Sequence, residues 1–345
     1  MANNRIIPFD VLRILAAFAV VMLHVTSDRL TTSFPSNEWE IRNVYDSFVR
    51  WCVPIFVMIS GALFLNHGRK ISVGRLYKKN ILHLIFIFFV WSFIYAIYLA
   101  IVKCDYNVSH ILFRIIEGPV HFWFLKMLIG LYVTIPILRM ITQNKQSEEY
   151  FLIVALITAF VLPMIFTFIG LYNESYKSFA LLHYNAYGIR IASGYVGYFV
   201  LGHYLYTYRL SGLVKRIIYI MGLFSVLSVI FLTHWYSHHI NESSELFYGN
   251  LNVFTLFESL SVYLAIIEFK IPTKYNSLVY RLSNFSLGVY LSHFLVLMLF
   301  NYFGIDSGSF NPLFFIPCYS LIVFVLSCLI VSLIMKIPIL KKLVV

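Results

Sequence analysis

Long apolar stretches recur along the whole chain and are separated by short polar connections. A helix that crosses a bilayer needs about 20 mostly apolar residues, because the hydrocarbon core is ~30 Å thick and a helix rises ~1.5 Å per residue. Such windows lie near residues 8–27, 46–65, 81–102, 121–141, 150–171, 187–206, 216–234, 251–267, 283–301 and 313–335. We therefore predict an all-α integral membrane protein with about ten transmembrane helices, forming a single membrane domain over residues 1–345.

The composition agrees with this pattern and excludes an ordinary soluble protein. Hydrophobic residues make up 60% of the chain and charged residues only 12%, whereas soluble domains are roughly one quarter charged. The formal net charge is +11, which in a soluble protein would suggest a nucleic-acid partner. In a membrane protein the distribution of Lys and Arg reports topology instead, so we expect no nucleic-acid partner.

The basic residues predict the orientation of the chain in the membrane. Cytoplasmic loops are enriched in Lys and Arg, so alternate loops should be basic. The basic loops hold Arg69, Lys70, Arg75, Lys78 and Lys79, then Arg139 and Lys145, then Arg209, Lys215 and Arg216, then Lys270, Lys274 and Arg281. The opposite loops are neutral or acidic, and Lys336, Lys341 and Lys342 come at the end of the chain. Both termini are therefore expected in the cytoplasm.

The cysteines and the first apolar stretch carry no sign of disulfides or processing. Cys52, Cys104, Cys318 and Cys328 form no CxxC pair and mostly fall inside apolar segments, so we expect neither a disulfide framework nor a metal site. No small-residue cleavage site follows the first stretch, and we expect it to remain as a transmembrane helix.

Ionisable residues in the first helix point to chemistry. Charged groups at membrane depth cost a few kcal/mol unless they face a protein interior or a cavity. Asp10 and Arg13 are three residues apart and can pair, while His24 follows Arg13 by eleven residues, which returns it to nearly the same face ~16 Å along the axis. A histidine can transfer protons near neutral pH, and an arginine can hold an anionic or carbonyl group. Alternatively, Asp10 and Arg13 form a helix-end pair and His24 reaches the outer interface.

Further polar residues interrupt later spans and are candidate substrate-binding or pore-lining groups. They are His121, Trp123, Lys126, Glu258 and His293. Structural alternatives are interhelical hydrogen bonds for Glu258 and His293, and a Lys126 that extends to the interface. Most aromatic residues are expected to face lipid, although Tyr184, Tyr187 and Tyr195 could form a sugar-binding surface.

A basic segment precedes the third span and contains Arg75, Lys78, Lys79 and His83. On the cytoplasmic side it can bind anionic lipid headgroups, or the phosphates of a cofactor that enters from the cytoplasm.

Four sequence blocks resemble the acyltransferase 3 family of membrane proteins. The segment from Phe9 to His24 is similar to the family's first helix, with its arginine and histidine separated by ten residues. Val53–Gly61 is similar to the second helix, His121–Phe124 to a middle helix and Ser286–His293 to the penultimate helix. The four blocks occur in the same order over most of the chain.

The resemblance implies an O-acyltransferase of the bacterial inner membrane. Such a protein moves an acyl group, usually acetyl from acetyl-CoA, to a hydroxyl of a cell-surface polysaccharide or its lipid-linked precursor, without a metal. It implies that His24 is the catalytic base, that Arg13 and Asp10 shape the donor side, and that the basic segment contacts the donor. The segment departs from the family's paired-arginine motif, since Arg75 and Lys78, Lys78 and Lys79, or Asn80 and His83 could stand at its two positions. No segment here corresponds to the extracytoplasmic esterase-like domain of longer members.

Two other functions are compatible with the same pattern. Pore-lining charges among ten helices also suit a transporter or exporter of a polysaccharide or acylated intermediate. Pro54, Pro136, Pro163 and Pro317 break several spans, but the chain shows no inverted repeat. A structural membrane subunit would leave the buried charges without a role.

Overall fold

The computed structural model describes residues 5–186, 194–305, 308 and 310–344, and within these every regular element is helical. The membrane-length segments are α1 (Ile7–Ser27), α2 and α3 (Asn37–Val49, Cys52–Phe64), α5 (Leu82–Val102), α7 (Trp123–Ile141), α8 and α9 (Lys145–Ala155, Leu162–Tyr172), α12 (Gly212–Ile240), α14 (Asn276–Tyr302) and α15 (Pro312–Lys336). Shorter elements are α4 (Val73–Leu76), α6 (Val108–Glu117), α10 (Glu174–Ala186), α11 (Val196–Thr207) and α13 (Val253–Glu268). Single turns complete the chain: η1 (Tyr77–Ile81), η2 (Val120–Phe122), η3 (Leu156–Val161), η4 (Thr273–Tyr275) and η5 (Leu340–Leu343).

Eight segments of the described residues are long and apolar enough to cross a membrane. They match eight of the predicted spans. The other two predicted spans, 187–206 and 251–267, correspond to α11 and α13, which have 12 and 16 residues. Residues 187–193 lie outside the described part. At ~1.5 Å per residue, α11 and α13 are roughly 18 and 24 Å long, shorter than the hydrocarbon core, and the count of ten stays a prediction.

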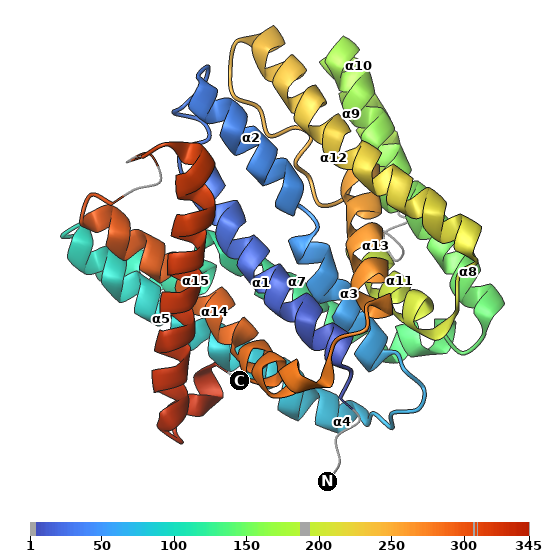
Figure 1. Cartoon of the computed structure of the whole chain (residues 1–345), viewed down its shortest axis with the longest axis horizontal. Coiled ribbons are helices and arrows are strands. Elements are labelled where there is room, and N and C mark those ends of the chain that lie inside the picture. Colours follow the sequence, from blue (N-terminus) through green and yellow to red (C-terminus); the bar gives the residue numbers. More distant parts are fainter. Residues whose placement is uncertain (1–4, 187–193, 306–307, 309, 345) are drawn as a thin grey trace.

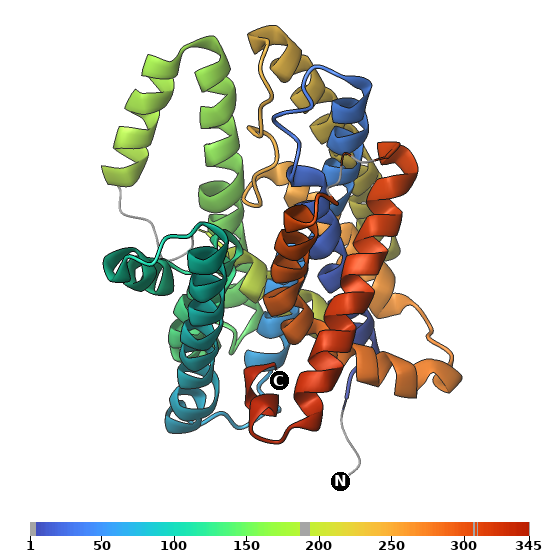
Figure 2. The same ribbon diagram turned by 90° about the vertical axis from the view of Figure 1, so that its left-hand side faces the viewer.

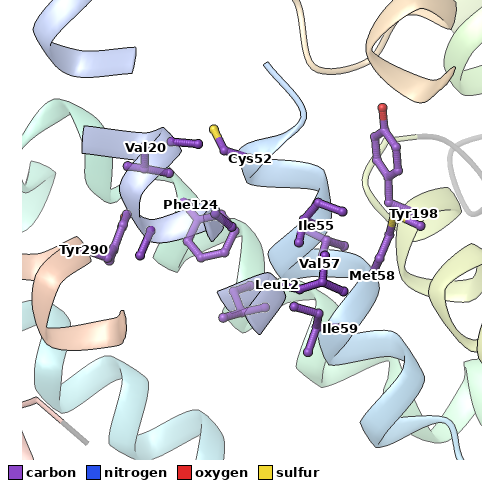
Figure 3. Packing of buried hydrophobic residues seen from close by; sticks show 14 of the residues in the cluster. Leu12, Val20, Cys52, Ile55, Val57, Met58, Ile59, Phe124, Tyr198 and Tyr290 are labelled. Atoms are coloured by element: carbon purple, nitrogen blue, oxygen red, sulfur yellow. The ribbon is translucent and has the colours of Figure 1, made fainter. Parts of the chain in front are cut away.

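Helix α1 runs through the middle of the bundle and packs against α2, α3, α13, α14 and α15 (Figure 1). Its start and the end of α15 lie at the same end of the molecule, together with α4. This arrangement agrees with an even number of crossings, and we call this end the terminal end. Leu12 of α1 and Ile55 and Ile59 of α3 belong to one apolar core, part of which Figure 3 shows.

Two glycines let α3 and α11 touch along their backbones. A Cβ at Gly61 would lie 1.7 Å from the carbonyl oxygen of Phe199, and a Cβ at Gly202 would lie 2.0 Å from that of Met58. No larger residue fits at either position without separating the helices. The short helix α11 is therefore fixed closely against α3.

The helices α6 and α10 lie outside the predicted spans, as does the single turn of α4. Helix α10 packs antiparallel on α9, so the chain turns back at Asn173 (Figure 2). Helix α6 has no buried residue, and its apolar side chains Leu112, Phe113 and Ile116 are exposed. An amphipathic helix of this kind is typical of a membrane interface.

Candidate active site

Three of the predicted residues, His24, His121 and His293, meet in one cluster. They come from the last turn of α1, from η2 and from the middle of α14. The ring centroids are 5.9 Å apart for His24 and His121, 5.2 Å for His24 and His293, and 5.3 Å for His121 and His293. Segments separated by more than 250 residues of sequence thus place three imidazoles within reach of one small ligand.

The ring nitrogens of this cluster are largely unpartnered. His121 and His293 are buried, with exposed fractions of 2% and 0%. Neither nitrogen of His121 has a hydrogen-bond partner, and Nε2 of His293 has none. Nδ1 of His293 lies 3.0 Å from the carbonyl oxygen of Val289, so in the neutral ring the proton sits on Nδ1 and Nε2 is an acceptor. Because most buried polar atoms in proteins are hydrogen-bonded, this concentration of free nitrogens indicates a site for a polar ligand.

A cavity of about 140 Å³ adjoins the cluster. His24, His121, Arg50 and Asn250 supply its polar wall, and apolar side chains including Val20 and Phe124 line the rest. The Tyr290 hydroxyl donates to the His121 carbonyl oxygen at 2.6 Å, which fixes η2 against α14.

Arg50 brings a positive charge to this cavity. Its guanidinium pairs with the buried Asp46, donates to the Tyr248 carbonyl oxygen at 3.1 Å and lies 4.1 Å from the centre of the Tyr248 ring. Its Nε has no partner. Arg50 was not among the predicted site residues. Its i, i+4 spacing from Asp46, just before the apolar run of α3, was the signal that it is an internal ion pair.

A larger cavity of about 650 Å³ opens on the other side of Trp123. Its polar wall contains Arg114, Glu117 and Lys126, and Trp123 lines both cavities. Lys126 is exposed, and its Nζ lies 5.5 Å from the centre of the Phe88 ring. Lys126 thus lines this larger cavity and is not part of the histidine cluster.

Asp10 and Arg13 form the predicted pair but lie in a different place from His24. The Asp10 carboxylate is fully buried and accepts from Arg13 Nη1 at 2.9 Å, from Arg5 Nε at 2.5 Å and from the Ser283 hydroxyl at 2.7 Å. Arg5, Arg13 and Arg69 line a cavity of about 330 Å³ at the terminal end. The sequence placed Arg13 and His24 on one stripe, and the structure gives each a separate cavity.

A comparison with protein-family models identifies the family. The model of the acyltransferase 3 family, described as an acyltransferase domain, matches residues 6–332. The chain belongs to the acyltransferase 3 family. Comparison with curated proteins and with solved structures found no match. The family model covers the lining residues of all three cavities except Arg5, so this membrane-helical acyltransferase domain carries both the histidine cluster and most of the arginine cavity.

The basic segment of this acyltransferase lies on the surface. Arg75, Lys78 and Lys79 are exposed and His83 is partly buried. None of the four lines the arginine cavity at the terminal end, and donor contact by this segment stays a prediction. The sequence analysis did not single out Arg5, because its role depends on Asp10 and Asn284, which accept from it at 2.5 and 3.1 Å.

Glu258 and the tyrosines predicted to bind sugar occupy different environments in the acyltransferase. Glu258 of α13 is buried, and neither carboxylate oxygen has a partner. The ring of Tyr195 lies beside that of Trp123, tilted by 38° with centroids 5.6 Å apart, whereas the Tyr184 hydroxyl donates to the Thr158 carbonyl oxygen at 2.6 Å. Tyr187 lies outside the described residues, so the three-tyrosine surface stays a prediction.

Proposed function

We propose that the protein is an O-acyltransferase of the bacterial inner membrane that moves an acetyl group from cytoplasmic acetyl-CoA to a hydroxyl of a cell-surface polysaccharide or its lipid-linked precursor. The observation that carries the proposal is the cluster of His24 with the buried His121 and His293, whose nitrogens are largely unpartnered, beside Arg50. Family membership supports acyl transfer, and the two outer cavities support separate donor and acceptor sides.

In this mechanism His24 takes the proton of the acceptor hydroxyl as its oxygen attacks the thioester carbonyl. The carbon–sulfur bond of the donor breaks, and His24 returns the proton to the departing thiolate. Arg50, whose Nε is free, stabilises the negative charge on the carbonyl oxygen during attack. Proton transfer of this kind contributes roughly 10²- to 10⁴-fold, and a preorganised charge contributes further. His293 and His121 orient His24 and the hydroxyl.

The donor is proposed to bind at the terminal end, with its phosphates against Arg5, Arg13 and Arg69. Between this cavity and the histidine cluster, α1 and α3 pack tightly, and Ala16, Ala17, Met58 and Ile59 are at most 2% exposed. Delivery of the acyl group therefore requires this packing to open around the thin pantetheine arm. The acceptor sugar is proposed to bind beside Trp123, whose ring offers an apolar face for a sugar next to the charges of Arg114, Glu117 and Lys126.

The test uses the full chain reconstituted in vesicles with labelled acetyl-CoA and an envelope fraction that contains lipid-linked glycans. Label on a sugar, lost at least 100-fold in His24→Ala and kept in His110→Ala, supports the proposal. His110 is a matched control, because its side chain is 62% exposed, is bonded to Asp105 and lines neither the cavity beside the cluster nor the one beside Trp123. Full acetylation by folded His24→Ala would refute the mechanism. Glycan crossing the bilayer without label would favour an exporter.

A further inference from the structure

Three metal-binding side chains meet at the end of the bundle opposite the terminal end. Glu40 of α2 lies with its Oε1 2.8 Å from Nδ1 of His234 and 3.2 Å from Nε2 of His238, both on α12. One ligand atom from each residue lies within 4.8 Å of the other two. The side chains are 38%, 47% and 44% exposed, so an ion can reach them from solvent.

The two helices hold this geometry through contacts on either side of the cluster. Asn43 of α2 donates to the Ile230 carbonyl oxygen of α12 at 3.1 Å, and the Trp39 indole N–H donates to the Ser243 hydroxyl at 2.9 Å. His234 and His238 are four residues apart, so a regular helix places them on one face. The backbone positions of all three ligands are therefore set by the fold.

Aromatic rings pack the two imidazoles into place. Trp39 is fully buried, and its ring centroid lies 6.4 Å from that of His234 and 5.9 Å from that of His238. The ring of Phe34 lies 5.2 Å from His238. Side chains that are held before the ion arrives lose little freedom on binding, which favours affinity.

The arginines near the cluster pair with Glu38, and Glu40 pairs with the two histidines. The nearest strong base along α2, Arg42, pairs with Glu38 at 2.7 Å, and Arg29 is 3.7 Å from the same Glu38 oxygen. The ion pairs of Glu40 within the described residues are those with His234 and His238. Its carboxylate is thus available as a third, anionic ligand.

We propose that Glu40, His234 and His238 bind a divalent transition-metal ion, with zinc as the reference ion. Two imidazoles and one carboxylate are a common zinc ligand set that leaves a fourth position for water. Zinc–nitrogen and zinc–oxygen bonds of ~2.1 Å place tetrahedral ligand atoms about 3.4 Å apart, a separation that small side-chain rotations reach from the observed one. The bound ion ties α2 to α12. The sequence did not reveal this site, because Glu40 is 194 residues from His234. The proposal does not depend on the acyl-transfer function.

The test measures zinc binding to the purified full chain in detergent after chelation and desalting, in competition with a chromophoric chelator. We expect one zinc per chain, and a loss of affinity of about 100-fold or more in Glu40→Gln, His234→Ala and His238→Ala. His239→Ala is the matched control. This neighbouring exposed histidine stacks on Trp235 with centroids 5.7 Å apart and lies outside the cluster, so its variant should bind as the wild type does.

A second measurement keeps the test independent of how well the variants fold. X-ray absorption of the zinc-loaded wild type should show only nitrogen and oxygen ligands near 2.0–2.1 Å, with two imidazoles, and zinc should raise the thermal unfolding temperature of the wild type. Absence of stoichiometric zinc, or equal affinity in His234→Ala and His239→Ala, would overturn the site.

Discussion

The crossing of α3 and α11 gives a stability prediction that follows directly from the geometry. A Cβ at Gly202 would lie 2.0 Å from the Met58 carbonyl oxygen and 2.5 Å from the Met58 carbonyl carbon. Carbon–oxygen contacts are normally no closer than about 3.3 Å, so Gly202→Ala must move the two backbones apart by roughly 1.3 Å. Neither contact is with a flexible side-chain end, and the strain cannot relax locally.

The expected cost is at the upper end of the range for overpacking, about 3 kcal/mol. Separation of the helices by this amount also weakens the dispersion contacts along their interface, and it displaces the Gly202 carbonyl oxygen, which accepts from the Tyr263 hydroxyl at 2.9 Å. Gly61→Ala should have a similar effect. The double variant should cost less than the sum, since the first substitution already opens the interface.

The assay is the fraction of monodisperse protein that remains after heating in detergent, measured by size-exclusion chromatography. Gly130→Ala is the matched control, because nothing lies within 4 Å of a Cβ at this position of α7. It should leave stability unchanged or raise it by up to about 1 kcal/mol through better helix propensity. A Gly202→Ala protein as heat-resistant as the wild type would refute the close-packed crossing.

Three further predictions concern the arginine cavity and the topology. Asp10→Asn should destabilise the protein by about 3 kcal/mol in thermal unfolding. This value is at the low end for a broken buried ion pair, because the arginine partners of Asp10 reach solvent. An unchanged melting temperature would contradict the prediction. Arg69→Ala should raise the KM for acetyl-CoA about tenfold, the loss of one charge-assisted hydrogen bond, whereas Lys78→Ala should not, and the reverse result would return the donor to the exposed basic segment. Cys104, exposed between α5 and α6, should react with a membrane-impermeant maleimide on intact cells and lose the label in Cys104→Ser. Labelling only after the membrane is disrupted would contradict the cytoplasmic location of the termini.

The sequence predicted most of the helical fold because lipid imposes one strong rule. A segment that faces hydrocarbon must be long, apolar and internally hydrogen-bonded, and eight segments of the described residues satisfy this rule. Helices α11 and α13, with 12 and 16 residues, are too short to satisfy it by themselves. Periodicity does not distinguish a short apolar helix packed inside the protein from part of a membrane span, so these two predicted spans stay predictions.

The sequence predicted the three histidines of the candidate site but not Arg50. His24, His121 and His293 were selected because a polar group inside an apolar helix needs a reason to be there, and the structure brings all three together. Arg50 was missed, since its position at a helix junction made it resemble a loop charge. A single sequence shows that an ionisable side chain lies in an apolar segment, but it does not show which other side chains lie beside it in the fold.

The two kinds of ionisable residue in α1 now have different physical roles. Asp10 has three donors and no exposed surface, so it acts on the acyltransferase through Arg5 and Arg13, which it holds at the rim of their cavity. His24 instead faces imidazoles with free nitrogens. A fully bonded buried group is costly to change but offers no site for a ligand, whereas a group in an unsatisfied cluster gains its partners only when substrate arrives. Substitution of Asp10 should therefore lower stability first, and substitution of His24 should lower turnover first.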